Sequence, residues 1–316
     1  MGRLSGGSPP VEPPTIRMTR ATRSIAATSG PTKMGRSAAR AAPFVVHSAA
    51  TRQRTSFAPA SEWYVWAMTH STTGPVHLLA LTGAGISVES GLSTYRAMNG
   101  LWRNHAVKDV ATPYGFAQDP VTSWSFWSER RAEAQRAVPN QGHVALATLE
   151  QLLGDRFLLV TQNVDGLHQR AGNQRVVELH GNLHESRCDK CERPRFADDR
   201  IYQGSAPKCE QCSDGLLRPA VVWFGEAIQQ KDMDVVERFM ARAAKHRFIF
   251  MAIGTSGIVT PASAFVEEAR KLGAESWLVN LDPARNEAYF DRVLLGESGT
   301  ILPQLLAEKR AQFMSP

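Results

Sequence analysis

The amino-acid sequence predicts an α/β protein in which a doubly wound parallel sheet carries a small inserted zinc-binding ribbon. Two observations lead to this fold class. From about residue 76 onward, short apolar runs alternate with segments of helical periodicity, as in parallel sheets covered by helices on both faces. Two Cys-x-x-Cys pairs, which contain all four cysteines of the chain, interrupt this alternation once.

The net charge of +6 is concentrated near the start of the chain. Residues 1–60 contain nine Lys or Arg and one acidic residue, which leaves 27 basic and 29 acidic residues in the remainder. A near-neutral folded part argues against specific nucleic-acid binding, and no apolar run is long enough to span a bilayer. We therefore expect a soluble, cytoplasmic protein with no membrane partner and no specific nucleic-acid partner.

Residues 1–67 form a basic tail rich in Arg, Ser, Ala, Thr and Pro. We expect this tail to be disordered, because it has too little apolar surface to offset its ordering entropy. It could be an organelle transit segment, a basic arm that contacts nucleic acid, or upstream sequence included by a start codon assigned too early. We favour the last interpretation, with Met68 as the true start, because the ordered pattern begins shortly after it.

The first predicted strand is the apolar run Val76–Leu81. Gly83 and Gly85 follow it, and they allow the main chain to approach a ligand closely before a helix begins. The positive end of a helix dipole suits a pyrophosphate. The third glycine of the dinucleotide fingerprint is absent, because Val88 occupies its position, so the turn alone is equally compatible with a connection that binds nothing.

Helices are predicted next along the chain. Thr112-Pro113 and Asp119-Pro120 each place a capping side chain before a proline, which is typical of helix starts. Two tryptophans follow Asp119 at helical spacing, and we interpret them as core or pocket lining rather than a stacking surface for nucleic acid. A further helix is predicted from about Gln141 to Leu153, in which His143 is interpreted as a packing residue.

The remaining apolar runs predict strands that end in small or polar residues. They are Phe157–Thr161, Val176–Leu179, Leu216–Phe224, Phe248–Ile253 and Trp277–Val279, with helices predicted at 232–245 and 261–271. In a Rossmann-like sheet, ligands bind outside the carboxyl ends of the strands, where the strand order reverses. Polar clusters follow four of the predicted strands, at 82–85, 162–165, 254–256 and 280–282. We therefore predict a dinucleotide at this edge, with its phosphates near the glycine turn and a ribose near Asn280 or Asp282.

The spacing of the cysteines predicts a zinc site. Cys188-x-x-Cys191 and Cys209-x-x-Cys212 are separated by 17 residues, as in zinc ribbons. Two disulfides or four unrelated thiols are alternatives, but a chain without a secretory signal disfavours disulfides. Four thiolates leave no open position on the ion, so the zinc should be structural. We assign the zinc-binding module to 184–215 and the sheet domain to 68–183 and 216–316.

The motifs form a distinctive series. In order, they are Gly83-Ala-Gly-Ile-Ser-x-Glu-Ser-Gly91, Tyr95-Arg96, Gly100-Leu-Trp102, Thr161-Gln-Asn-Val-Asp165, Leu179-His-Gly181, the paired cysteines, Arg218-Pro-x-Val-Val-Trp-Phe-Gly-Glu226, Gly254-Thr-Ser256 and Asn280. Over about residues 78–306, this series resembles the sirtuins, a family of NAD-dependent protein lysine deacylases. Residues 1–67 have no counterpart in the resemblance.

The resemblance implies that NAD is a co-substrate, that one zinc ion is structural, and that acylated lysine side chains of proteins are the partners. Asp165 is expected to accept a hydrogen bond from the nicotinamide carboxamide, and Asn163 to order the ribose and a water. The full set assigned to NAD is Gly83, Ala84, Gly85, Ile86, Ser87, Glu89, Tyr95, Arg96, Trp102, Gln162, Asn163, Asp165, Gly254, Thr255, Ser256, Asn280 and Asp282.

The resemblance also implies a mechanism, in which His180 and Asn163 are the catalytic residues. The acyl oxygen of the modified lysine attacks C1′ of the ribose and expels nicotinamide. His180 matches the family's general base, which deprotonates a ribose hydroxyl, and its ordinary pKa near neutrality suits that task. The alternative is a core histidine at the end of a strand. His168 and His184 are assigned no role.

Two further expectations concern the substrate. One segment resembles the family's peptide-binding segment, which pairs with the substrate as an added strand, although an ordinary edge strand is the alternative. Its residues are Val221, Val222, Trp223 and Phe224. Sirtuins that remove acidic acyl groups carry a Tyr-x-x-Arg pair, and the matching positions here are Trp127 and Arg130. Arg130 could pair with a succinyl or malonyl carboxylate, but the tyrosine hydroxyl is absent.

We therefore expect a deacetylase, with desuccinylation or demalonylation weaker or lost. Mono-ADP-ribosyl transfer is an alternative enzyme class, because it uses the same activated C1′ with a protein side chain as acceptor. A sensor that binds NAD or ADP-ribose without catalysis and a zinc-ribbon protein that binds nucleic acid are two non-enzymatic possibilities. Nicotinamide release that depends strictly on an acylated peptide separates a deacylase from these classes.

Overall fold

The computed structural model describes residues 74–94, 101–102, 105–191 and 193–314, with only the main chain for 101–102. The predicted tail at 1–67, Tyr95, Arg96 and the side chain of Trp102 lie outside the described residues. Among the residues described, no helix is long and apolar enough to cross a membrane.

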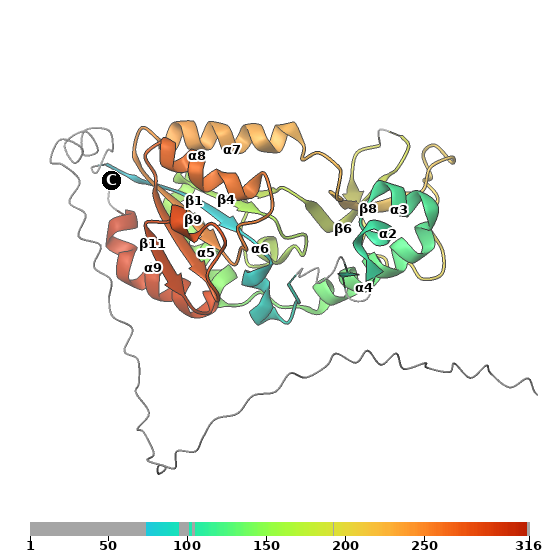
Figure 1. The fold of residues 1–316 in the computed structure, drawn as a ribbon, viewed down its shortest axis with the longest axis horizontal. Helices are drawn as coiled ribbons and strands as arrows, with labels where there is room; N and C mark the ends of the chain where they lie inside the picture. The colour runs from blue at the N-terminus through green and yellow to red at the C-terminus, as the bar shows by residue number, and fades with distance from the viewer. Residues whose placement is uncertain (1–73, 95–100, 103–104, 192, 315–316) are drawn as a thin grey trace, which may run out of the picture. The chain divides into compact units, whose positions relative to one another are not determined.

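Six parallel strands form the main sheet, in the order β11-β10-β9-β1-β4-β5 (Figure 1). They are β1 (Val76–Thr82), β4 (Phe157–Thr161), β5 (Val176–Glu178), β9 (Arg247–Ile253), β10 (Glu275–Asn280) and β11 (Arg292–Leu295). The chain moves outward from β1 through β4 to β5, then returns to the other side of β1 with β9. The boundary between β1 and β9 is therefore the switch point of a doubly wound sheet, which confirms the predicted fold class.

Helices cover both faces of this sheet. Leu79 and Leu81 of β1 pack in one core with α7 (Gln230–Ala243) and α8 (Phe265–Lys271), which follows the short turn η3 (Ala262–Ala264). The alternate β1 residues, Leu78 and Ala80, pack in a second core with α5 (Gln141–Leu153) and α9 (Ser298–Met314). Because β1 lies in the middle of the sheet and is covered on both faces, all seven of its residues are buried.

The two predicted helix starts are confirmed. The Thr112 hydroxyl accepts from the Gly115 N–H at 3.0 Å, and α3 (Pro113–Gln118) follows. The Asp119 carboxylate accepts from the Thr122 N–H at 2.9 Å, and α4 (Pro120–Arg136) follows. Each proline stands at the first helical position, where no main-chain hydrogen bond is lost.

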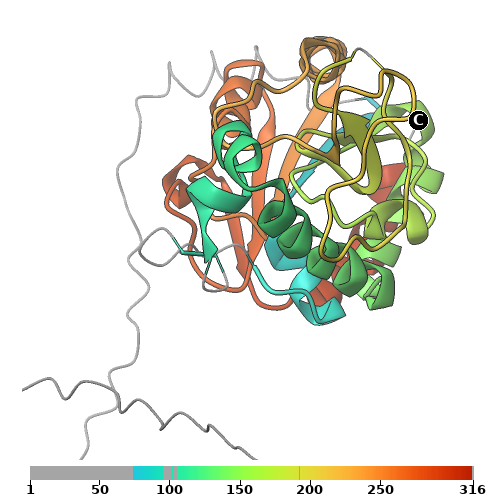
Figure 2. The ribbon, with the colours of Figure 1, turned by 90° about the vertical axis from the view of Figure 1, so that its right-hand side faces the viewer.

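A smaller antiparallel sheet, in the order β7-β6-β8, lies beside the helices of residues 107–136 (Figures 1 and 2). The elements here are β2 (Leu101–Trp102), β3 (His105–Ala106), α2 (Val107–Val110), β6 (Gly181–Cys188), β7 (Phe196–Ala197) and β8 (Leu217–Val221). A third core joins α3 and α4 to this sheet, and the Trp124 indole N–H donates to the Leu217 carbonyl at 2.7 Å. The predicted limits 184–215 remain a prediction; the small sheet itself starts before residue 184 and ends after residue 215.

Arg131 connects α4 to the ribbon. Its side chain is fully buried, and its guanidinium donates to the carbonyls of Leu183 at 2.6 Å and Arg200 at 2.7 Å. The Asp198 carboxylate lies 3.7 Å away and supplies the counter-charge. A buried charge is tolerated only when it is paired and hydrogen-bonded in this way, so these contacts fix α4 on the small sheet.

Candidate active site

The carboxyl ends of β1, β4, β9 and β10 open onto a cavity of about 940 Å³, which is in the range of ligand pockets. Most of the predicted site residues line it. They are Gly83, Ala84, Gly85, Ser87, Glu89, Gln162, Asn163, Asp165, His180, Gly254, Thr255, Ser256, Asn280 and Asp282, together with Trp127, Arg130, Val221, Val222, Trp223 and Phe224. Ile86 does not line the cavity, because its side chain is fully buried in the core with α5 and α9, so its assignment to NAD remains a prediction.

The glycine turn packs main chain against main chain at the switch point. The N–H of Gly83 donates to Ile253 at 2.9 Å, and that of Gly85 donates to Gly254 at 2.8 Å. A Cβ on Gly85 would lie 2.6 Å from the Gly254 Cα, so neither Gly85 nor Gly254 can be replaced by a residue with a side chain. Val88, at the position of the missing third glycine, is 44% exposed, and no close packing demands a glycine at that point. The segment after the turn is the 3₁₀ helix η1 (Ala84–Ser90).

Glu89 connects this segment to the C-terminal helix. Its carboxylate accepts from the Ser298 hydroxyl at 2.8 Å and from the Gly299 N–H at 2.9 Å, in the first turn of α9. An acidic group is stabilised at a helix N-terminus by the dipole and the free N–H groups. Glu89 therefore lines the cavity while its carboxylate anchors the loop.

Ser87, Asn163 and Asp165 form one hydrogen-bonded group. The Ser87 hydroxyl donates to Asp165 Oδ2 at 2.7 Å, and Asn163 Nδ2 donates to the Gly83 carbonyl at 3.1 Å and lies 3.2 Å from the Ser87 oxygen. Burial raises the pKa of Asp165, while the hydrogen bonds from the Leu167 N–H and Ser87 act in the opposite direction. These bonds fix the Asp165 carboxylate at the end of β4.

His180 has the tautomer that a general base requires. Its Nδ1 lies 2.9 Å from the Gln162 carbonyl, and a carbonyl oxygen can only accept, so Nδ1 carries the hydrogen and Nε2 keeps its lone pair. Burial lowers the pKa of His180, with a smaller opposite effect from this hydrogen bond. The ring is therefore neutral at pH 7 and can accept a proton at Nε2.

His168 is buried next to the loop that follows β4, although the sequence analysis assigned it no role. Its Nε2 is 2.8 Å from the Thr82 hydroxyl, which donates to the Thr161 hydroxyl at 2.8 Å. The Asn163 N–H donates to the same Thr161 oxygen at 3.0 Å. Buried chains of hydrogen bonds restrict the conformation of a loop, although His168 Nδ1 has no hydrogen-bond partner among the described residues. His168 thus supports the main chain of Asn163 from the core side.

A second buried histidine, His143, packs against His168, with the ring centroids 4.8 Å apart. His143 also closes a capping box at the start of α5, since its Nδ1 accepts from the Asn140 N–H at 3.3 Å. Burial lowers the pKa of His143 to about 4 and lowers that of His168 well below its ordinary value. Both rings are neutral in the folded protein at pH 7.

Acidification is expected to destabilise the fold through His143 and His168. Because folding lowers their pKa values, the unfolded chain binds more protons below pH 6.5. Their contribution to stability is therefore complete above that pH and falls as the pH falls, for His143 down to about pH 4. Each group adds a slope of at most about 1.4 kcal/mol per pH unit. Urea unfolding across this pH range measures the free energy of unfolding. His143→Gln should flatten its slope against pH, and an unchanged slope would contradict the contribution assigned to His143.

His184 joins the small sheet to the loop that follows β4. Its Nδ1 lies 2.5 Å from an Asp199 carboxylate oxygen, and its Nε2 lies 3.1 Å from the main-chain carbonyl of Asp165. The sequence offered no signal for this role, because the three groups are brought together only by the packing of the ribbon on the main sheet. His184 is therefore a structural bridge between the two.

Arg218 holds the segment Val221–Phe224 in place through Trp223 and Glu226. The buried Arg218 guanidinium lies 3.3 Å from the Trp223 ring and forms two hydrogen bonds with the Glu226 carboxylate, at 2.7 and 2.9 Å. The N–H groups of Val222, Trp223 and Phe224 already donate to the His180 carbonyl, the Glu226 carboxylate and the Ala111 carbonyl. A peptide that pairs with this stretch as an added strand therefore cannot use those three N–H groups. It can pair only with the remaining main-chain groups.

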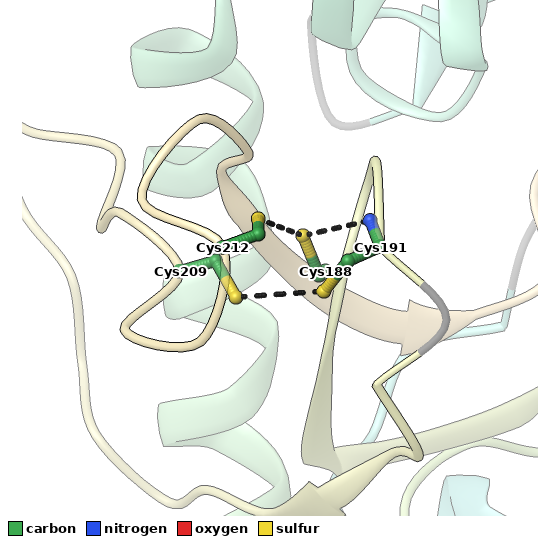
Figure 3. A group of neighbouring side chains, drawn as sticks. All are labelled: Cys188, Cys191, Cys209 and Cys212. Carbon is green, nitrogen blue, oxygen red and sulfur yellow. Dashed lines mark hydrogen bonds between the residues drawn. The ribbon is translucent and has the colours of Figure 1, made fainter.

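The four cysteines come together as predicted (Figure 3). The sulfurs of Cys188 and Cys212 are 3.7 Å apart, and those of Cys191 and Cys209 are 3.8 Å apart. A tetrahedral ion with Zn–S bonds of about 2.3 Å places its sulfurs about 3.8 Å apart, whereas a disulfide needs about 2.05 Å. The cluster therefore fits one structural zinc ion and excludes disulfides between these pairs.

Comparison with known proteins decides the family. The sequence model of the Sir2 family matches residues 83–261. The chain belongs to the Sir2 family. This sirtuin is 44% identical over 232 residues to an NAD-dependent protein deacylase of Salmonella typhimurium, covering 72% of this chain and 82% of that protein. It is 41% identical over 244 residues to an NAD-dependent protein deacylase of Pasteurella multocida, covering 75% and 99%.

Solved structures agree with this assignment and confirm the resemblance predicted from sequence. A complex of a Sir2 homologue with NAD superimposes with a TM-score of 0.69 and 35% identity, covering 80% of this sirtuin and 94% of that chain. A mutant Sir2 homologue bound to ADP-ribose gives a TM-score of 0.69 and 35% identity over 76% of this sirtuin and 94% of that chain. The family match at 83–261 includes the glycine turn, His180 and all four cysteines.

Proposed function

We propose that the chain is an NAD-dependent protein lysine deacylase, which transfers the acyl group from lysine to ADP-ribose and releases nicotinamide. The observation that carries this proposal is His180, a neutral histidine whose Nε2 is free to accept a proton in the wall of the large cavity. The similarity to bacterial NAD-dependent protein deacylases supports the same reaction. Proteins that carry acylated lysine are its proposed partners.

The residues present suit NAD. When bound, NAD supplies a ribose carbon whose bond to nicotinamide breaks when an acyl oxygen attacks. Gly83 and Gly85 line the cavity at the switch point with main chain alone, which suits a pyrophosphate. At the far end, the Asn280 amide donates to the carbonyls of Thr255 at 3.1 Å and Asp282 at 2.7 Å, which fixes it beside the proposed ribose position.

The chain's own groups then perform three tasks. Asp165 presents a fixed carboxylate acceptor for the nicotinamide carboxamide, and the Asn163 amide is held beside it. The Nε2 atom of His180 accepts a proton from a ribose hydroxyl. The resulting imidazolium is stabilised by the Gln162 carbonyl. Trp127, Trp223 and Leu183 line the cavity and keep water from the reacting atoms.

We propose acetyl as the preferred acyl group. The Trp127 indole N–H already donates to the Val110 carbonyl at 2.6 Å, so it does not replace the tyrosine hydroxyl expected in desuccinylases. The Arg130 guanidinium is paired with the Glu133 carboxylate at 3.0 Å, whereas its contact with the exposed Glu129, at 3.3 Å, is weakened by solvent. Neither polar group of the predicted acyl-binding pair is therefore fully available to an acidic acyl chain.

The acyl ranking is tested with acetyl, succinyl and malonyl forms of one peptide on one purified sample. One missing hydrogen bond to a charged group is worth about 1.5–3 kcal/mol, so kcat/KM for acetyl should exceed that for succinyl by at least about 10-fold. Trp127→Tyr, which restores the hydroxyl, should narrow the difference. A wild-type preference for succinyl would refute the ranking but leave the reaction class in place.

Mono-ADP-ribosyl transfer is the alternative reaction at the same site. It would release nicotinamide without an acylated peptide and would label a protein side chain. Mass spectrometry of protein and peptide products distinguishes the two reactions directly.

A further inference from the structure

Helix α4 presents an unexpected ion pair to the cavity. Trp127, Arg130 and Ala134 recur at helical spacing and line its wall, and Glu133 lines it too. The side chain of Arg130 is only 9% exposed, and that of Glu133 is 26% exposed. Arg130 Nε lies 3.0 Å from Glu133 Oε2, and Arg130 Nη2 lies 3.1 Å from Glu133 Oε1.

This contact is bidentate. Two parallel N–H···O bonds join one edge of the guanidinium to both oxygens of the carboxylate, which is the strongest and most specific way for arginine to bind a carboxylate. A carboxylate at the end of an acyl chain would seek the same edge. Glu133 therefore occupies the position on Arg130 that an acidic acyl group needs.

The other edge of the guanidinium points to the same conclusion. Arg130 Nη1 is buried and has no hydrogen-bond partner within the described part of the chain, and a buried donor left unpaired is costly. The other two nitrogens, Nε and Nη2, already donate to carboxylates. With the charge of Arg130 already neutralised by Glu133, a second carboxylate at this guanidinium would be repelled by Glu133.

We propose that Glu133 determines acyl specificity: as an internal counter-ion of Arg130, it excludes acyl groups that end in a carboxylate and favours neutral ones. This inference rests on the proposed deacylase function. Displacing Glu133 would break its bidentate contact with Arg130, and keeping it in place would bring two carboxylates to one guanidinium. Both outcomes disfavour succinyl and malonyl groups over acetyl.

Glu133→Gln tests the proposal, because it removes the negative charge and keeps the shape. The ratio of kcat/KM for succinyl-lysine peptide to that for acetyl-lysine peptide should rise by at least about 10-fold, mainly through a lower KM for succinyl. The double variant Glu133→Gln with Arg130→Met should lose the gain. Glu129→Gln is the matched control: Glu129 also contacts Arg130 but is 61% exposed and outside the cavity wall, so the ratio should not change.

Binding provides a second readout. Fluorescence anisotropy of labelled succinyl-lysine and acetyl-lysine peptides, in the presence of NAD, measures specificity whether or not turnover occurs. A wild-type protein that turns over neither peptide would refute the proposed function, while the binding ratio would still decide the role of Glu133. An unchanged ratio in a folded Glu133→Gln protein overturns the inference. If that variant does not fold, Glu133→Met, which also lacks the charge, is measured against the same two outcomes.

Discussion

Replacing His180 with alanine is expected to lower kcat for deacylation by about 10²–10⁴-fold while NAD binding and the fold are retained. The variant lacks the Nε2 lone pair that accepts the ribose proton, but it leaves the glycine turn and the Ser87–Asn163–Asp165 group in place. Continuous measurement of nicotinamide release with an acetyl-lysine peptide gives the rate. Calorimetric titration with NAD and thermal unfolding report binding and stability.

A histidine remote from the cavity provides the control. His246 precedes β9 at the amino end of the sheet, where its ring stacks on His77 with centroids 4.3 Å apart. His246→Ala should keep full activity, because this end of the sheet is opposite the cavity. Persistent activity in His180→Ala would contradict the assignment of His180 as the general base. A loss of NAD binding would show that His180 instead maintains the structure of the site.

The second large effect concerns zinc. Cys209→Ser is expected to abolish stoichiometric zinc and to inactivate the enzyme. Binding of structural zinc contributes about 10–16 kcal/mol in zinc-finger peptides, which is comparable to the whole stability of a domain. Cys188 and Cys209 belong to the same core as Val221 and Trp223, so disorder in the ribbon removes one wall of the cavity. Elemental analysis, circular dichroism and deacylase rates measure the three consequences.

Ser205→Ala, an exposed position in the same loop, is the matched control and should retain zinc and activity. Chelation of zinc from the unaltered protein should reproduce the Cys209→Ser result. A Cys209→Ser protein with full activity and one zinc ion would show that the ion is held elsewhere.

Much of the fold follows from local patterns. The boundaries of α5, predicted at Gln141–Leu153, match the structure because an Asn140 cap and an apolar face act together. Strand β4 likewise matches its apolar run. Strand β11 and helix α9 had no prediction, because β11 is short and largely exposed, and Pro303 interrupts an already weak amphipathic pattern in α9.

The sequence predicts those residues of the candidate site that directly follow a strand. The polar groups after β1, β4, β9 and β10 meet at one edge because parallel strands share the direction of their carboxyl ends. His168 and Glu133 could not be found this way. His168 depends on Thr82 of β1, which packing brings against it. Glu133 pairs with Arg130, three residues earlier on α4, but the sequence does not show that this pair faces the cavity.

The stoichiometry of one reaction mixture tests NAD-dependent deacylation most directly. Purified protein, NAD and an acetyl-lysine peptide are incubated, and nicotinamide, free lysine peptide and acetyl-ADP-ribose are quantified together by mass spectrometry. We expect equal amounts of all three products, and none when either NAD or the acetyl group is omitted. Nicotinamide release that is independent of the acetyl group, or deacetylation without NAD, would contradict this reaction.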